Sequence, residues 1–156
     1  MSAVNQAVGA TTASSSPVAT GAQEREAAVA ASLQLLRVAL GLQVLLGLLW
    51  GVSMLVFARA ITTGDPSGAH VEKIALEGAA HLTLVFAAIL VWRAPRQSRD
   101  TLLVMIFLNG LWALTDAVYM PLFGLAPLEY GVKLVVNAAL AVLLFAGGRR
   151  AGILSR

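Results

Sequence analysis

The chain has 156 residues, of which 58% are hydrophobic and 12% are charged, and its mean hydropathy is +0.81. Soluble domains carry about a quarter charged residues, so this composition excludes a water-soluble fold and predicts an integral membrane protein of one domain. The net charge of +3 is carried by bases that flank apolar segments; they indicate orientation in a lipid bilayer and no nucleic-acid partner.

Cysteine is absent, and histidine occurs only at His70 and His81. The absence of cysteine excludes disulfides, thiolate nucleophiles and iron–sulfur clusters. Two histidines are too few for a His-rich metal centre or a bis-histidine haem site. We therefore expect neither a metal site nor a cofactor.

The beginning of the chain, residues 1–23, is predicted to be a disordered tail because it consists of small and polar residues without charge. It lacks the basic stretch and apolar core of a cleaved signal peptide. Good helix formers follow, so the membrane domain is expected to cover 24–150, with its first helix beginning near Glu24.

The first membrane span is predicted at 38–58, between Arg37 and Arg59. Its 21 uncharged residues are enough to cross an apolar core of about 30 Å at about 1.5 Å per residue. Gly47 and Gly51 form a GxxxG pair within this span, a pattern typical of close helix packing.

Three further apolar runs complete a predicted four-helix bundle. They lie at 74–92, 101–120 and 128–146. Pro95 is expected to end the second helix and Pro121 to lie just beyond the third. Because the links are short, consecutive helices should be antiparallel neighbours. The predicted fold is an all-α, up-down-up-down transmembrane bundle followed by a C-terminal tail at 151–156.

The basic residues are distributed unequally between the two sides that four spans define. One side holds eight, namely Arg25, Arg37, Arg93, Arg96, Arg99, Arg149, Arg150 and Arg156. The other side holds three, namely Arg59, Lys73 and Lys133. Because cytoplasmic loops carry an excess of Lys and Arg, we expect both termini in the cytoplasm and a multi-pass protein of the bacterial inner (plasma) membrane.

Polar and ionisable residues recur within the predicted spans, and most lie in the outer half of the bilayer. The candidate site residues are Glu77 and His81 in the second span, Asn109 and Asp116 in the third, and Lys133 and Asn137 in the fourth. Spacings of four or seven place each set on one helical face. Glu129 belongs to the same layer, four residues before Lys133.

Hydrocarbon solvates such groups poorly, since a charge at the centre of a membrane helix costs on the order of 2.5–3.5 kcal/mol. We therefore expect them to turn inward, with Lys133 pairing with Asp116 or Glu77 and one carboxylate left near His81. Several alternatives stay open. Glu129 and Lys133 could reach the interface, the two asparagines could only join helices, and the whole layer could be a structural network.

Trp50 and Trp112 lie near the middle of the membrane by the same residue count, away from the interface that tryptophan prefers. They are predicted either to line a pocket below the polar layer or to pack in the core, and core packing is the favoured alternative.

Short motifs give the chain a resemblance to known membrane proteins over about residues 36 to 146. They are Gly64-Asp65-Pro66, Arg93-Ala94-Pro95, Asp116 with Tyr119 and Gly124, and Leu36-Arg37 with Gly41. The first three resemble BphX-like proteins of aromatic-degradation operons, and the last is similar to the DoxX-like group of four-helix membrane proteins. The resemblance implies a four-helix fold and a family-like position at Asp116, and it implies no activity.

Four functions fit these residues. The protein could bind a small apolar or amphiphilic molecule entering from the outer leaflet, or it could be an accessory subunit of a larger membrane complex. In either role it could assemble as a homo-oligomer. It could be a proton-coupled transporter. It could also be an enzyme in which His81 and a carboxylate act as general acid and base. The sequence contains no nucleophile motif or cofactor fingerprint, so binding and accessory roles are favoured over enzyme activity.

Overall fold

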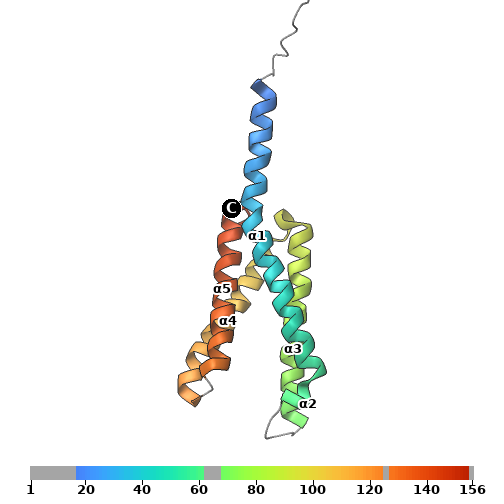
Figure 1. Cartoon of the computed structure of the whole chain (residues 1–156), viewed down its shortest axis with the longest axis vertical. Helices are drawn as coiled ribbons and strands as arrows, with labels where there is room; N and C mark the ends of the chain where they lie inside the picture. The colour runs from blue at the N-terminus through green and yellow to red at the C-terminus, as the bar shows by residue number, and fades with distance from the viewer. Residues whose placement is uncertain (1–16, 62–67, 125–126, 155–156) are drawn as a thin grey trace, which may run out of the picture.

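The computed structural model describes residues 17–61, 68–124 and 127–154. Every regular element in these ranges is helical and none is a strand, which confirms the predicted all-α class. The helices are α1 (Pro17–Val56), α2 (Ala58–Ile61), α3 (Gly68–Arg93), the 3-10 helix η1 (Pro95–Gln97), α4 (Arg99–Phe123) and α5 (Pro127–Arg150), as Figure 1 shows.

Four helices in the described ranges, α1, α3, α4 and α5, are long and apolar enough to cross a membrane. Their candidate spans are Glu26–Val56, Val71–Arg93, Arg99–Phe123 and Tyr130–Arg150. Large apolar side chains point outward from all four. Examples are Leu45, Phe86, Phe107 and Val142, each at least 62% exposed. An apolar exterior of this kind matches hydrocarbon and not water, as expected of a multi-pass membrane protein.

The long helices form two closely packed antiparallel pairs, α1 with α3 and α4 with α5. α1 also packs against α5, whereas α3 and α4 have the least contact among neighbouring long helices. In Figure 1 the two pairs lie together at the end that carries η1 and the C-terminus, and they diverge toward the end that carries α2. We refer to these as the η1 end and the α2 end.

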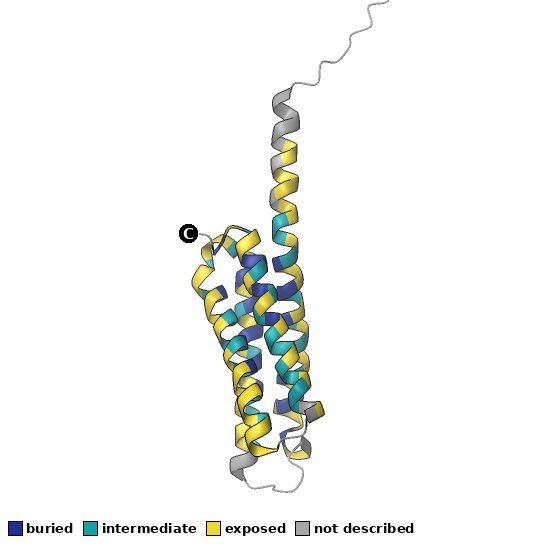
Figure 2. Ribbon diagram, turned by 90° about the vertical axis from the view of Figure 1, so that its left-hand side faces the viewer, coloured by how far each residue is buried: buried dark blue, intermediate teal, exposed yellow. Residues whose placement is uncertain are grey.

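The tightly packed core lies in the half of the bundle nearer the η1 end. Its members come from every long helix and include Leu36, Leu40, Val91, Met105 and Leu144, each no more than 1% exposed. Figure 2 shows buried residues along the inside of the bundle and exposed residues on its outward faces. Among the described residues, this core cluster takes none from the α2-end third of any long helix, so the α2 end has a different construction.

The GxxxG pair of α1 packs against α3 within the same chain. An added Cβ on Gly47 would lie 3.3 Å from the carbonyl oxygen of His81, and one on Gly51 would lie 3.0 Å from the carbonyl oxygen of Gly78. Gly78 is equally constrained, because its own Cβ would lie 2.9 Å from the carbonyl oxygen of Gly51. Small residues permit this approach of two backbones, and it sets α1 directly against the part of α3 that carries His81.

Gly78→Ala is therefore expected to lower the free energy of unfolding by about 1–3 kcal/mol, the usual cost of overpacking. The neighbouring atoms are two backbone atoms of α1, in Gly51 and Leu55, and the Cβ of Met54, and none of them can move aside as the far end of a flexible side chain can. Unfolding by SDS titration in mixed micelles measures the loss. Gly110→Ala is the matched control, because a Cβ there meets no atom within 4 Å, and it should be neutral or stabilising by up to about 1 kcal/mol through helix propensity.

The structure differs from the predicted boundaries at three places. α1 begins at Pro17 and not near Glu24, since proline suits the first turn of a helix, where its missing N–H is not needed. The remainder of the predicted tail, residues 1–16, lies outside the described residues. Pro121 lies inside α4, which continues to Phe123 and ends at Gly124 in the left-handed conformation (φ 60°).

The third difference concerns the predicted C-terminal tail. Gly152 adopts a φ of 70°, and the chain turns back so that the Ile153 N–H donates a 2.9 Å hydrogen bond to the Gly148 carbonyl. This is the way many helices end at glycine. Ile153 is then only 6% exposed and joins the core cluster, so residues 151–154 are part of the bundle, whereas residues 155–156 lie outside the described residues.

Candidate functional site

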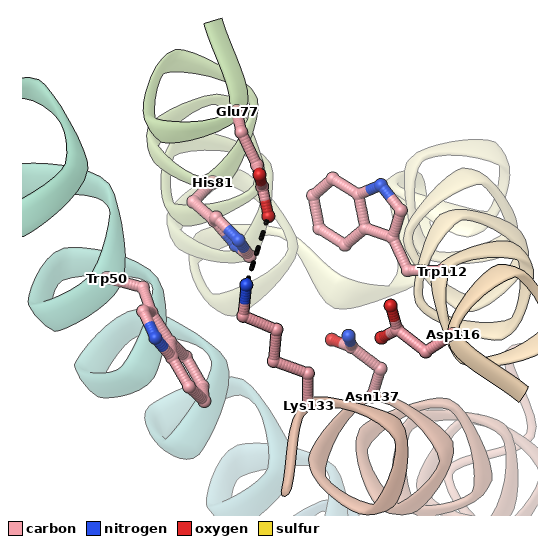
Figure 3. Close-up of a pocket in the computed structure, with 7 residues that line it drawn as sticks. All are labelled: Trp50, Glu77, His81, Trp112, Asp116, Lys133 and Asn137. Carbon is pink, nitrogen blue, oxygen red and sulfur yellow. Dashed lines mark ion pairs between the residues drawn. The ribbon is translucent and has the colours of Figure 1, made fainter. Parts of the chain in front are cut away.

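A polar pocket lies where the two helix pairs diverge, in the middle and α2-end part of the bundle. It is lined by Trp50, Glu77, His81, Trp112, Asp116, Lys133 and Asn137, so all four long helices contribute to it (Figure 3). These are seven of the eight residues singled out from the sequence. The cavity volume is about 40 Å³, which is room for a few water molecules and far below the volume of about 300–1,000 Å³ of a site that encloses a drug-sized ligand.

An ion pair joins α3 to α5 at the edge of the pocket. Lys133 Nζ lies 3.8 Å from Glu77 Oε1, and the two side chains are 19% and 38% exposed. The same Nζ lies 5.3 Å from the centre of the Tyr130 ring, within the range of a cation–π contact. Of the two partners predicted for Lys133, the structure thus forms the pair with Glu77, and the ammonium is held inside the bundle.

His81 is enclosed by the two tryptophans. Its ring lies 6.2 Å from Trp50 in a stacked arrangement and 4.6 Å from Trp112 in a tilted one, measured between ring centres. The His81 side chain, which belongs to α3, is therefore held between α1 and α4, and His81 is only 9% exposed. The predicted alternatives for the tryptophans, pocket lining and packing, are combined here, because both rings line the pocket and contact His81.

Asp116 and Asn137 project toward one another and toward the centre of the pocket, from α4 and α5 respectively (Figure 3). Within the described part of the chain, Asp116 makes no hydrogen bond and no ion pair shorter than 4.0 Å. The pocket thus contains one carboxylate engaged by an ammonium group and one carboxylate without such a partner.

Asn109 is the predicted site residue that does not line the pocket. It lies on the pocket side of the packed core, where its Nδ2 donates hydrogen bonds to Gln43 Oε1 at 2.9 Å and to the Met105 carbonyl at 2.8 Å. Asn109 and Gln43 are both buried, at 0% and 2% exposure respectively. The interhelical role that the sequence left open for Asn109 is the one formed, and it connects α1 to α4.

Sequence reasoning did not identify Gln43 as the partner of Asn109, nor Gly78 as the point of closest approach to α1. The available signal for Gln43 is that it precedes Trp50 by seven residues and therefore shares its face of α1. Asn109 Oδ1 is fully buried and has no hydrogen-bond partner among the described residues. A buried polar atom without a partner is costly, so loss of the Gln43–Asn109 hydrogen bond would add further unsatisfied polar groups to the core.

We expect a double-mutant cycle on Gln43→Leu and Asn109→Leu to give a coupling energy between about 0.6 and 1.7 kcal/mol, the average and the maximum measured for interhelical hydrogen bonds in a membrane protein. The stability losses of the two single variants should add up to more than the loss of the double variant, because each single variant leaves a buried polar group without its partner. Unfolding in SDS measures all four corners of the cycle. A coupling energy of zero would contradict the pair.

Two predicted polar residues cannot be placed. The side chains of His70 and Glu129 lie outside the described ones. Among the side chains that the structure does describe, no three of His, Asp or Glu come together as metal ligands.

Comparison with known proteins gives no relative: no family model, no curated protein and no solved structure matches this chain. The resemblance to BphX-like and DoxX-like proteins therefore stays a prediction, and the function has to be inferred from the pocket.

Proposed function

We propose that this protein binds a small amphiphilic molecule, with the polar head group in the pocket and the apolar part between the helices and the surrounding lipid. The observation that carries the proposal is the convergence of polar side chains from all four long helices on one cavity in an otherwise apolar bundle. A cavity of about 40 Å³ suits a head group and not a whole ligand, so the apolar remainder of the molecule would lie in the surrounding hydrocarbon.

The pocket faces the outer leaflet of the plasma membrane in this proposal, with both termini in the cytoplasm. The exposed arginines of the η1 end support this orientation; they are Arg37, Arg93, Arg96, Arg99, Arg149 and Arg150. The α2 end carries exposed Arg59 and Lys73. Such an excess of arginine favours the η1 end as the cytoplasmic one, and a ligand then reaches the pocket from the extracytoplasmic side.

The packed core favours binding over transport. Below the Gln43–Asn109 pair, apolar side chains such as Leu40, Met105 and Leu144 fill the η1 half of the bundle, so no polar route continues toward the η1 end among the described residues. A proton-coupled transporter is the second candidate, because His81 and Asp116 lie beside a cavity of the size of a few water molecules. Proton-dependent uptake into proteoliposomes would favour this second candidate.

The accessory-subunit role loses one of its supports. The GxxxG pair of α1, which could have bound a partner helix, is occupied by α3 of the same chain. Copurification of a stoichiometric partner after mild solubilisation would restore that role.

Binding can be measured through the intrinsic fluorescence of the protein. Of the three tryptophans, two line the pocket, and Trp92 lies on the exposed side of α3. In a Trp92→Phe variant, a ten-carbon amphiphile should therefore change the emission in a saturable way with a stoichiometry near one. A variant that keeps only Trp92 reports unspecific partitioning into the micelle. A linear response in both variants for every head group tested would refute the proposed function.

A further inference from the structure

The chemistry of the head group can be narrowed by the charge of the pocket. Glu77 and Asp116 supply two carboxylates and Lys133 supplies one ammonium, so the formal charge is −1 with His81 neutral. The other lining residues are uncharged. A cavity with surplus negative charge in a low-dielectric surrounding attracts a cation and repels an anion.

The surplus charge has a definite position. Lys133 is held by Glu77 at 3.8 Å and by the face of Tyr130, whereas Asp116 has neither an ion pair nor a hydrogen bond among the described residues. A carboxylate inside a membrane helix is costly unless it meets a partner. Asp116 is therefore the group that gains most from a bound cation, and Asn137 beside it offers a carbonyl acceptor (Figure 3).

The hydrogen-bond acceptors of the pocket restrict the cation further. A primary ammonium group is about as large as a water molecule, donates three hydrogen bonds and accepts none. That pattern suits the carboxylate of Asp116 and the amide oxygen of Asn137. A trimethylammonium group has no N–H to donate, so it leaves both of these acceptors without a hydrogen bond.

We propose that the pocket selects the primary ammonium group of an apolar amine and that Asp116 is its counter-ion. This assignment rests on the proposed binding function and adds the chemical class of the ligand to it. Trp50 and Trp112 line the same cavity, so their ring faces add cation–π attraction near the head group.

The test compares three probes with the same ten-carbon chain, decylammonium, decyltrimethylammonium and decanol, in neutral detergent at one pH. The protein carries Trp92→Phe, so that its emission reports Trp50 and Trp112. Decylammonium is expected to bind at least tenfold more tightly than either of the other probes. Asp116→Asn should reduce its affinity to that of decanol, whereas Asp116→Glu should retain most of the preference.

The controls distinguish binding in the pocket from a general effect of carboxylates on the protein surface. Glu72→Gln removes an exposed carboxylate from the same protein and should leave the ranking of the three probes unchanged. Binding of decanol to Asp116→Asn shows that this variant is folded. If Asp116→Asn does not fold, Asn137→Leu provides the second variant and should weaken decylammonium more than decanol.

The other outcomes distinguish failure of the cation assignment from failure of the binding function. If decanol binds as tightly as decylammonium and Asp116→Asn changes neither, the cation assignment is wrong while amphiphile binding stands. If decyltrimethylammonium binds most tightly, selection of the primary ammonium group by its N–H donors is wrong. If none of the probes gives saturable binding, the proposed function fails together with this inference.

Discussion

Trp112→Ala is expected to lower the free energy of unfolding by about 2–4 kcal/mol, somewhat less than the range of about 3–5 kcal/mol for a fully buried aromatic side chain, because Trp112 is partly buried. The indole contacts His81 at 4.6 Å between ring centres and forms one wall of the pocket. Its removal therefore opens the space between α3 and α4, the two neighbouring helices with the least other contact. SDS-induced unfolding in mixed micelles, followed by circular dichroism, measures the loss.

Two further variants make this result specific. Trp112→Phe preserves an aromatic ring next to His81 and removes fewer side-chain atoms, so it should cost clearly less than Trp112→Ala. Trp92→Ala removes a side chain that is 47% exposed and should cost clearly less than Trp112→Ala. Equal losses at positions 92 and 112 would show that Trp112 has no packing role beyond that of a tryptophan on the surface.

Lys133→Met is expected to destabilise the protein by about 2–3 kcal/mol, somewhat less than the loss of one partner from a fully buried ion pair. It leaves Glu77 and Asp116 in one pocket without a cation. Lys133→Met combined with Glu77→Gln should recover at least half of the loss, because the remaining carboxylate then has no charged neighbour to repel it. The same SDS titration gives both values.

Lys73→Met is the matched control for this pair, since Lys73 lies exposed near the beginning of α3 and its removal should change the stability little. The ion pair would be excluded as a stabilising element if Lys133→Met and the double variant lost the same free energy. It would also be excluded if Lys73→Met cost as much as Lys133→Met.

The two ends of the bundle differ in how their side chains pack. At the η1 end, side chains such as Leu36 and Met105 are fully buried and hold the helices together. At the α2 end, the helix pairs separate and polar side chains occupy the space between them. A firmly packed half can support a more open half, and this arrangement limits the stability cost of a polar pocket.

The sequence was sufficient for those features that are set by the energetics of one helix in a membrane. The four apolar helices follow from long uncharged runs. The convergence of Glu77, His81, Asp116 and Lys133 follows because each would be costly against lipid and because a spacing of four keeps Glu77 and His81 on one face. These arguments need no knowledge of how the helices cross.

Features that depend on the rotation and crossing of two helices could not be predicted. The GxxxG pattern of α1 did not indicate that Gly78 lies opposite it, and nothing local distinguishes Gly78 from Gly110, which meets no neighbour. The pairing of Gln43 with Asn109 joins residues 66 positions apart. The return of Ile153 to the core likewise depends on a space that only the assembled bundle provides.

The proposed orientation places the polar pocket in contact with water on the extracytoplasmic side, and the absence of native cysteine allows a direct measurement of this access. Asn137→Cys places a thiol in the pocket, and Val135→Cys places one at nearly the same depth on a face that is 65% exposed. A small charged methanethiosulfonate reacts with thiolates, which form in water and not in hydrocarbon. Added outside intact cells, it should modify the cysteine at position 137 at least tenfold faster than that at position 135. Equal rates at the two positions, or modification of position 137 only in inverted vesicles, would contradict access of water to the pocket from the extracytoplasmic side.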